Sequence, residues 1–309
     1  MVKPVICVTL NPAIDRTGQV ETLTPGRVNL VIKSFDRYGG KGINMAAVLV
    51  QFGVPAIASG LMGSKSVADF KENLQSRGIH YAFSTVPGET RQNIKLVDKD
   101  TEVTDINFPA FDCSSADVDL VLAMALAYDF DYIALGGSLP ATLPADTYAY
   151  MTKELKKAGK KVLLDTSGVA LKEAIKEKPW FIKPNNFELE DLMDTKLKTQ
   201  KEIIECAKDL QKKYVDNVVV SLGEDGAIFC NANGCINAVP PAQKVVSTVG
   251  AGDSLVGSWL AATVLGKDDT EVAKTAVTAS ALSVTHLGVG VTNMEDFEAL
   301  KQKVKVKKL

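Results

Sequence analysis

Short apolar runs alternate with longer amphipathic stretches along most of this chain of 309 residues. The apolar runs predict β-strands at residues 5–10, 57–61, 132–135, 161–164, 180–182, 217–220 and 227–230. The amphipathic stretches predict helices at residues 43–52, 66–77, 145–158, 169–176, 200–214, 270–285 and from 294 onward. Strands that alternate with helices favour a large α/β domain on a parallel sheet with right-handed crossovers.

A second set of extended segments interrupts this alternation. Apolar and polar positions alternate within residues 19–35, around a Pro25-Gly26 turn. Residues 91–97 and 102–108 flank Asp98-Lys99-Asp100, which predicts a hairpin turn. Together these segments predict a small sheet outside the main one, and we interpret it as a lid.

Residues 247–254 have the sequence Ser-Thr-Val-Gly-Ala-Gly-Asp-Ser and precede a long apolar helical stripe. With the apolar pair Val245 and Val246 before them, they predict a strand, a glycine turn and the first turn of a helix. Glycines let successive N–H groups converge at the positive end of the helix, which makes an anion site. The stretch is not a Walker A loop, because no Gly-Lys-Ser/Thr follows, and Leu255 stands where a dinucleotide fingerprint needs its third glycine.

Asp253 closes this glycine stretch and has two interpretations. Aspartate is a favoured helix N-cap, and capping could be its only role. Beside a phosphate cradle, however, a carboxylate can accept the proton of an attacking hydroxyl in phosphoryl transfer. The helix dipole should keep Asp253 ionised and make it a weak base.

A second glycine nest, Gly39-Gly40-Lys41-Gly42, precedes the helix predicted at 43–52, and Gly53 would end that helix. Alone it could be only a tight turn. Two such nests in one chain suggest two anionic ligands, or two phosphates of one reaction.

Polar residues gather where predicted strands end, which is where open α/β sheets bind ligands. Asp15 could bind ligand hydroxyls or form a turn, and Arg91 could bind a phosphate or lie on the surface. Asn185 and Glu188 could cap a helix or hold hydrated Mg²⁺ near phosphates. The turn at 221–226 could line a nucleotide or be a plain hairpin. The small residues Ala279, Ser280 and Ser283 could admit an adenine ring or let helices pack.

Composition narrows the classes of partner. A net charge of −2 gives no electrostatic footprint for nucleic acid, and the basic cluster at 301–308 predicts a solvated helix end or tail. No apolar run has the length of a membrane span, and the first residues lack a signal-peptide core. The chain has only two histidines, far apart in sequence, so we expect no histidine-based metal site.

Five cysteines are scattered along the chain, at positions 7, 113, 206, 230 and 235, and none is in a C-x-x-C pair. An odd number without a pattern favours reduced thiols in a cytosol over a disulfide framework. We therefore expect a cytoplasmic protein with no membrane or nucleic-acid partner.

Taken together, these loops resemble the ribokinase-like sugar kinases of the phosphofructokinase-B group over nearly the whole chain. Two signatures carry the resemblance, Gly39-Gly40-Lys41-Gly42-Ile43-Asn44 and Thr248-Val249-Gly250-Ala251-Gly252-Asp253. The stretches at 11–15, 137–140 and 183–185 are similar to the branch that phosphorylates ketohexose phosphates. Finer matches at 27–31, 102–105 and 245–248 resemble members that act on fructose 1-phosphate.

The resemblance implies a three-layer α/β/α domain at 1–15, 39–90 and 109–309, with a β lid at 16–38 and 91–108 that is often a homodimer contact. It implies ATP and Mg²⁺ as cofactors and Asp253 as the base. It implies an anion hole formed by Gly250, Ala251 and Gly252. The implied sugar-phosphate ligands are Asp15, Gly39, Gly40, Lys41, Asn44, Arg91, Ser138 and Asp253. The implied ATP ligands are Lys183, Ser221, Gly223, Asp225, Gly226, Thr248, Gly250, Gly252 and Ser280. Asn185 and Glu188 are the implied Mg²⁺ ligands.

Two alternatives stay open from the sequence. One is a kinase of the same class that acts on tagatose 6-phosphate or fructose 6-phosphate, because stereochemical preference depends on a few hydroxyl contacts. The other is a sugar-phosphate sensor without turnover, against which the intact Asp253 and both glycine nests argue.

Overall fold

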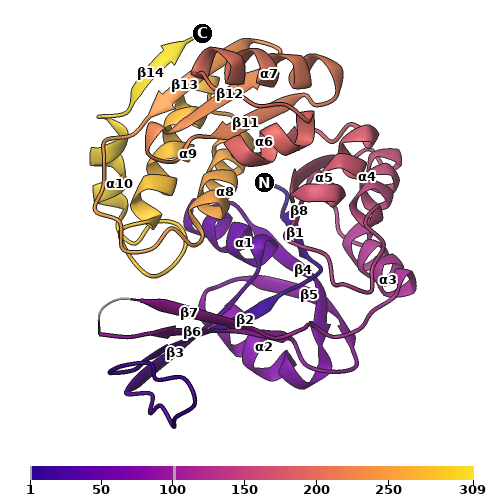
Figure 1. Ribbon diagram of the computed structural model, residues 1–309. Helices are drawn as coiled ribbons and strands as arrows, with labels where there is room; N and C mark the ends of the chain where they lie inside the picture. Colours follow the sequence, from indigo (N-terminus) through magenta and orange to yellow (C-terminus); the bar gives the residue numbers. More distant parts are fainter. Residues whose placement is uncertain (1, 100–101) are drawn as a thin grey trace.

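The computed structural model describes residues 2–99 and 102–309, which form a large sheet covered by helices and a smaller sheet beside it (Figure 1). The large sheet has ten strands in the order β14-β13-β12-β11-β10-β9-β8-β1-β4-β5. The neighbours from β11 to β5 pair in parallel, and β12, β13 and β14 extend one edge with antiparallel pairs. The predicted α/β fold with a mostly parallel sheet is confirmed.

The strands of the large sheet are β1 (Val5–Thr9), β4 (Ala56–Gly63), β5 (His80–Val86), β8 (Tyr132–Gly136), β9 (Lys161–Asp165), β10 (Phe181–Ile182), β11 (Asn217–Ser221), β12 (Ala227–Asn231), β13 (Gly234–Val239) and β14 (Lys305–Lys308). The helices are α1 (Lys41–Gln51), α2 (Val67–Ser76), α3 (Ser115–Leu126), α4 (Thr147–Lys157), α5 (Gly168–Ala174), α6 (Asn186–Met193), α7 (Gln200–Lys213), α8 (Ala251–Val264), α9 (Asp269–Ser283) and α10 (Met294–Lys301). Short 3-10 turns are η1 (Ser64–Ser66), η2 (Ile175–Glu177) and η3 (Gly223–Asp225).

The central strands are apolar on both faces because helices cover both. In β1, Val5 and Cys7 pack into the core under α1, α8 and α9, whereas Ile6 and Val8 pack into the core under α3, α4 and α7. Successive side chains of a strand point to opposite faces, so one short run feeds two cores. The sheet therefore lies between two layers of helices, as Figure 1 shows.

The smaller sheet has the order β3-β2-β6-β7 and lies to one side of the main body in Figure 1. Its strands are β2 (Ala13–Gln19), β3 (Lys33–Gly39), β6 (Arg91–Val97) and β7 (Val103–Asn107). Strands β2 and β6 are parallel, and β3 and β7 pair antiparallel at the two edges. Part of the predicted turn between β6 and β7, at Asp100, lies outside the described residues.

Three local expectations were wrong. Residues 20–32 contain no strand, so the extended segment predicted at 19–35 is in strands only at its two ends, at Gln19 in β2 and at residues 33–35 in β3. Val245 and Val246 also form no strand, because the Val246 N–H donates to Val284 O at the end of α9 (2.7 Å). In the basic cluster at 301–308, Lys301 does end helix α10, but residues 305–308 form strand β14 instead of a tail, since an edge strand can pair its backbone while lysine side chains remain in water.

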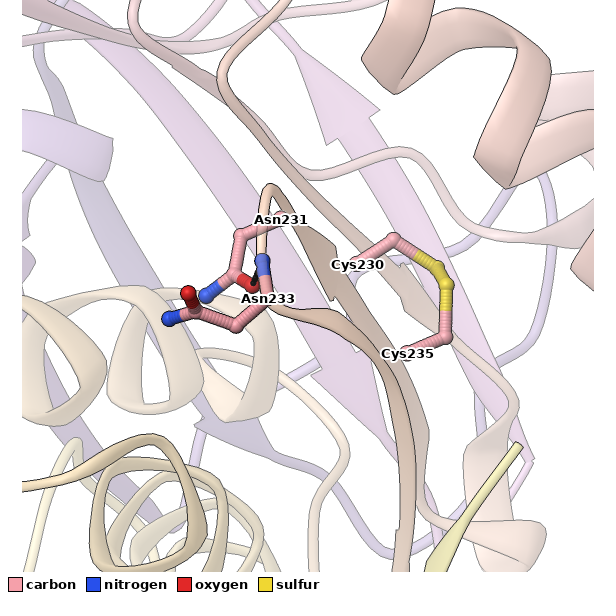
Figure 2. Close-up of a disulfide and its surroundings, with 4 residues drawn as sticks. All are labelled: Cys230, Asn231, Asn233 and Cys235. Carbon is pink, nitrogen blue, oxygen red and sulfur yellow. Dashed lines mark hydrogen bonds between the residues drawn. A yellow bond between two sulfur atoms is a disulfide. The ribbon is translucent and has the colours of Figure 1, made fainter.

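Strands β12 and β13 form a hairpin that holds Cys230 opposite Cys235, and the two are joined in a disulfide (Figure 2). Their Cα atoms are 4.2 Å apart. The expectation of five reduced thiols is therefore wrong, because spacing along the chain did not reveal the facing register of the two strands. At the hairpin tip, Asn233 N–H donates to Asn231 Oδ1 (2.8 Å), and both side-chain amides donate to Asp269 on α9.

None of the helices in the described ranges is long and apolar enough to cross a membrane.

The disulfide predicts the thiol count of the unfolded chain. Of the five cysteines, Cys7, Cys113 and Cys206 are free. In denaturant without reductant, titration with a thiol reagent should detect three thiols per chain, rising to five after reduction. The Cys230→Ser/Cys235→Ser variant should give three under both conditions, and five thiols before reduction would contradict the pairing.

Candidate active site

The predicted base, Asp253, lies in the first turn of α8 and is 7% exposed. Helix α8 begins at Gly250, whose φ of 89° is in the left-handed region that glycine tolerates best. The Ala251 N–H donates to Thr248 O (3.3 Å), so one of the three predicted anion-hole amides is engaged in the turn. Within residues 2–99 and 102–309, the amides of Gly250 and Gly252 have no hydrogen-bond acceptor. These two N–H groups are available to an anion at the positive end of α8.

Helix α1 brings the second glycine nest to the same place. Gly40 stands before its first residue with a φ of 139°, and no side chain caps the helix. From this helix the Asn44 side-chain amide donates to Asp253 Oδ2 over 2.6 Å. The two signatures, distant in sequence, are thus joined by a direct hydrogen bond.

Asp165, at the carboxyl end of β9, gathers two lysines beside Asp253. Its Oδ1 lies 3.0 Å from Lys41 Nζ and 3.6 Å from Lys183 Nζ, and its side chain is 1% exposed. Lys183 follows β10, and its side chain passes next to Gly252. A Cβ atom added to Gly252 would lie 3.6 Å from Lys183 Nζ. Two carboxylates and two ammonium groups therefore meet where α1 and α8 begin.

Burial and neighbouring charges set the protonation of this cluster. Burial raises the pKa of Asp253 above its ordinary value, and Asp165 adds to this, although Lys41 and the Asn44 hydrogen bond oppose it. This corrects the expectation of a weak base, because burial disfavours the charged form of the carboxyl and raises its pKa. Burial would also raise the pKa of Asp165, but Lys183 and Lys41 outweigh it and hold this pKa below its usual range. Burial alone would lower the pKa of Lys41, but Asp165 and Asp253 raise it.

A polar group of residues faces the same edge from the smaller sheet and from loops after β1 and β8. The Asn11 side-chain amide donates to Ser138 Oγ (3.1 Å), and Arg91 donates to Asn11 O (3.5 Å). Asp15 lies inside β2, where its Oδ1 accepts from the Asn93 side chain (2.7 Å). Gly39 and Arg91 flank Ala13 on neighbouring strands, so the first nest borders this group.

Three atoms of this polar group are buried without a hydrogen-bond partner among the described residues, namely Asn11 Oδ1, Arg91 Nε and Asn93 Oδ1. Buried polar atoms are normally paired, so such a concentration indicates a place where a polar ligand binds.

The predicted nucleotide segment is the turn between β11 and β12. Ser221 ends β11, Gly223 and Asp225 form η3, and Gly226 has a φ of 79° with the Ala238 carbonyl against its Cα. Ser221 also bridges to Asn185 in parallel, which brings this turn next to Lys183. The turn joins two antiparallel strands and is therefore a hairpin, which was one of its two predicted roles, beside lining a nucleotide.

Two other predicted nucleotide contacts lie farther along the chain. Thr248 is exposed, just before α8, and Ser280 is half-buried in the last turn of α9. The loop at 246–247 is tied to Val284, which follows α9, through two backbone hydrogen bonds. Thr248 and Ser280 therefore lie on segments that are held together.

The predicted metal ligands, Asn185 and Glu188, form a capping box at the start of α6. Each side chain accepts the backbone N–H of the other residue over 2.8 Å. Among the described residues, no group of three or more His, Cys, Asp or Glu could hold a metal ion. One carboxylate with an uncommitted oxygen fits Mg²⁺ bound through water and phosphates, and does not fit a cage made of protein ligands.

Sequence reasoning assigned no role to Asp165, Asn93 or Asn11. Asp165 was visible as a polar strand end, but its link to Lys41 depends on the order of strands in the sheet. Asn93 faces Asp15 only because β2 and β6 pair in parallel.

Comparison with known proteins identifies the family of the chain. The model of the pfkB family carbohydrate kinases matches residues 5–296. The chain is 37% identical to a 1-phosphofructokinase of Vibrio cholerae, covering 100% of this chain and 98% of that protein. It is 36% identical to a 1-phosphofructokinase of Escherichia coli over 98% of both. The crystal structure of phosphofructokinase-2 from Escherichia coli shares the fold, with a TM-score of 0.91, 24% identity and coverage of 98% of this chain and 99% of that one. The chain belongs to the pfkB family of carbohydrate kinases.

Proposed function

We propose that this chain transfers the γ-phosphoryl group of ATP to fructose 1-phosphate and forms fructose 1,6-bisphosphate. The observation that carries the proposal is the buried Asp253 carboxylate between two unpaired glycine amides and two lysines. The full-length relatives named 1-phosphofructokinase support the choice of acceptor.

Asp253 acts as the base in this proposal. Its Oδ2 is held by Asn44, which leaves Oδ1 for the acceptor hydroxyl. The hydroxyl oxygen bonds to the γ-phosphorus as the bond from that phosphorus to the β,γ-bridging oxygen breaks. The hydroxyl proton moves to Asp253, and ADP leaves with the electron pair. A raised pKa makes the carboxylate a better proton acceptor.

Lys41 and Lys183 stabilise the charge on the moving phosphoryl group, together with the amides of Gly250 and Gly252. Asp165 is a positioning residue, because it holds both ammonium groups without facing the acceptor. Preorganised donors of this kind cost no rearrangement at the moment of reaction.

The sugar phosphate binds between the smaller sheet and the carboxyl ends of β1 and β8. The Arg91 guanidinium meets its phosphate, because a planar fork of donors suits phosphate oxygens and Arg91 Nε is buried and unpaired. Asp15 and Asn93, paired with each other, take sugar hydroxyls, as does Ser138.

ATP lies along the turn at 221–226 and the start of α8, with Lys183 near its phosphates. Mg²⁺, when bound to these phosphates, neutralises part of their charge. Glu188 and Asn185, paired in the capping box, would hold the hydrated ion near these phosphates.

We further propose that two copies of the chain associate through the lid. The segment between β2 and β3 exposes Val28 (91%), Leu30 (80%) and Ile32 (68%), and β7 exposes Val103 and Ile106. Such a concentration of exposed apolar side chains is unusual for a monomer surface. A second copy would cover these side chains with its own lid, as the resemblance to lid-dimerising kinases implies.

The acceptor is tested by ADP release from MgATP with fructose 1-phosphate, fructose 6-phosphate and tagatose 6-phosphate in parallel. We expect the highest kcat/KM with fructose 1-phosphate. Asp253→Ala should lower kcat at least a hundredfold, because it removes the base. Preference for tagatose 6-phosphate would move the substrate, near-normal turnover of Asp253→Ala would reject the base, and no turnover on any acceptor would favour the sensor.

The raised pKa of Asp253 predicts a stability cost of keeping the base ionised. A carboxyl whose pKa is higher in the folded than in the unfolded chain destabilises the fold once pH rises above its ordinary pKa, about 3.9. At pH 7, Asp253→Asn should therefore raise the free energy of unfolding in urea by roughly 1 kcal/mol. The gain should disappear as pH falls below about 4.

Asp165→Asn is the matched control for this measurement. The pKa of the native Asp165 carboxyl is lowered in the folded chain, so its ionised form stabilises the fold. Asp165→Asn should therefore lose stability at pH 7. A destabilised Asp253→Asn at pH 7 would contradict the cost assigned to the base.

The lid contact is tested by sedimentation. The variant Leu30→Asp/Ile32→Asp should shift the mass from twice the chain mass of 33.1 kDa to that of one chain, because buried charges without partners are costly. Val169→Asp/Leu120→Asp, which alters exposed apolar residues on α5 and α3, should stay dimeric. A wild-type monomer, or a dimer unaffected by the lid variant, would reject this contact.

A further inference from the structure

A cavity of about 630 Å³ opens at the edge of the large sheet opposite the candidate active site. Its lining includes Lys161, where β9 begins, and residues 214–216, just before β11. Asp165, at the other end of β9, belongs to the active site, so about 13 Å of strand separates the two places. The cavity shares no residue with the active-site cluster, and we call it the lysine cavity.

Positive charge dominates its lining, which contains one carboxylate, Asp216, and six lysines, Lys156, Lys160, Lys161, Lys178, Lys212 and Lys213. The whole chain has 35 basic and 37 acidic residues, so this composition departs strongly from the average. Like charges at this density repel one another unless an anion or a protein group compensates them.

Protein groups compensate some of these lysines. Lys156 donates to the carbonyls of Glu177 and Lys178 (both 2.7 Å), and Lys160 donates to Phe130 O (2.7 Å). Lys213, in the last turn of α7, lies 3.4 Å from a carboxylate oxygen of Asp209 and complements the helix dipole.

The ammonium groups of Lys178 and Lys212 have no such partner. Within the described part of the chain, neither forms a hydrogen bond or an ion pair, and both side chains are exposed at the cavity. The helix dipole favours Lys156 in the last turn of α4, and Lys212 and Lys213 in the last turn of α7, but Lys178 follows η2 and lies in no helix. Both ammonium groups are therefore free to bind an anion in the cavity.

An aromatic side chain at the cavity connects it to the catalytic helix. Lys161 Nζ lies 5.1 Å from the Trp180 ring, and the Trp180 ring lies 5.4 Å from that of Trp259. Trp259 belongs to α8, which carries Asp253 in its first turn. An anion that moves Lys161 would change the surroundings of Trp180, one of only two tryptophans in the chain.

We propose that the lysine cavity is a second anion-binding site, for a small molecule that carries at least two phosphate groups. Ammonium groups act as point charges for phosphate, and the volume is in the range of small-molecule sites. The six lysines and Asp216 give the lining a net charge of five, because hydrogen bonds to carbonyls remove no charge. One phosphate group, with a charge of about −2, would neutralise less than half of it. The site does not depend on the proposed reaction, because its lining and its opening lie at the other end of the strands.

The test is calorimetric titration with pyrophosphate, without Mg²⁺. Wild-type protein should show two binding events, one at each end of the strands. Lys178→Gln/Lys212→Gln should weaken one event at least tenfold, and Lys183→Gln should weaken the other. The double variant Lys153→Gln/Lys201→Gln, which removes the same charge from exposed positions outside the cavity, should keep both.

Three further readouts make the result decisive. Tryptophan fluorescence of Lys183→Gln should still respond to pyrophosphate, and inorganic phosphate should bind the cavity at least tenfold more weakly. Lys178→Gln/Lys212→Gln should keep its folding and its turnover in the absence of added anion. Two intact binding events in this variant, or a single wild-type event that Lys183→Gln abolishes, would overturn the second site. Equal affinity for phosphate and pyrophosphate would overturn the requirement for two phosphates.

Discussion

The candidate active site depends on the ion pairs that the Asp165 carboxylate forms with Lys41 and Lys183. This carboxylate is buried and lies between two ammonium groups that come from α1 and from the end of β10. Removing one partner from a buried ion pair costs about 3–5 kcal/mol, so the strand order and the start of α1 are constrained together. A hydrogen bond from Asn44 holds Asp253 in the same cluster. The charged groups at the carboxyl ends of the parallel strands are thereby fixed relative to one another.

Among the described residues, the two α-helices that carry the glycine signatures to this cluster differ from the other α-helices in having a glycine at the N-cap. Helices α3, α6 and α7 have capping boxes, in which side chains accept the first backbone N–H groups. Helices α1 and α8 begin at Gly40 and Gly250 without a side-chain cap. Uncapped amides are a cost to a helix in isolation, and they become an anion site when a phosphate supplies the missing acceptor. In the proposed site, glycine at these two N-caps leaves the first amides open to a phosphate.

The sequence predicted what depends on neighbouring residues and missed what depends on distant ones. Apolar runs located the central strands, and glycines located both uncapped helix starts. The strand expected at Val245 and Val246 failed because the end of α9 takes the hydrogen bond of Val246. The disulfide required strand register. For Asp253 the helix dipole was visible along the chain, whereas the burial that raises its pKa depends on elements folded against it.

The two ends of β9 hold lysines in opposite electrostatic states. At the carboxyl end, Lys41 and Lys183 are matched by Asp165 and Asp253, so the cluster is close to neutral before a substrate binds. In the proposed mechanism, directional donors there recognise the phosphates, and moderate ground-state attraction lets a product leave while the transition state is stabilised. At the amino end, Lys178 and Lys212 have no carboxylate partner in the described part of the chain, and in the proposed second site their charge attracts an anion. The same sheet thus separates a place suited to turnover from one suited to holding a ligand.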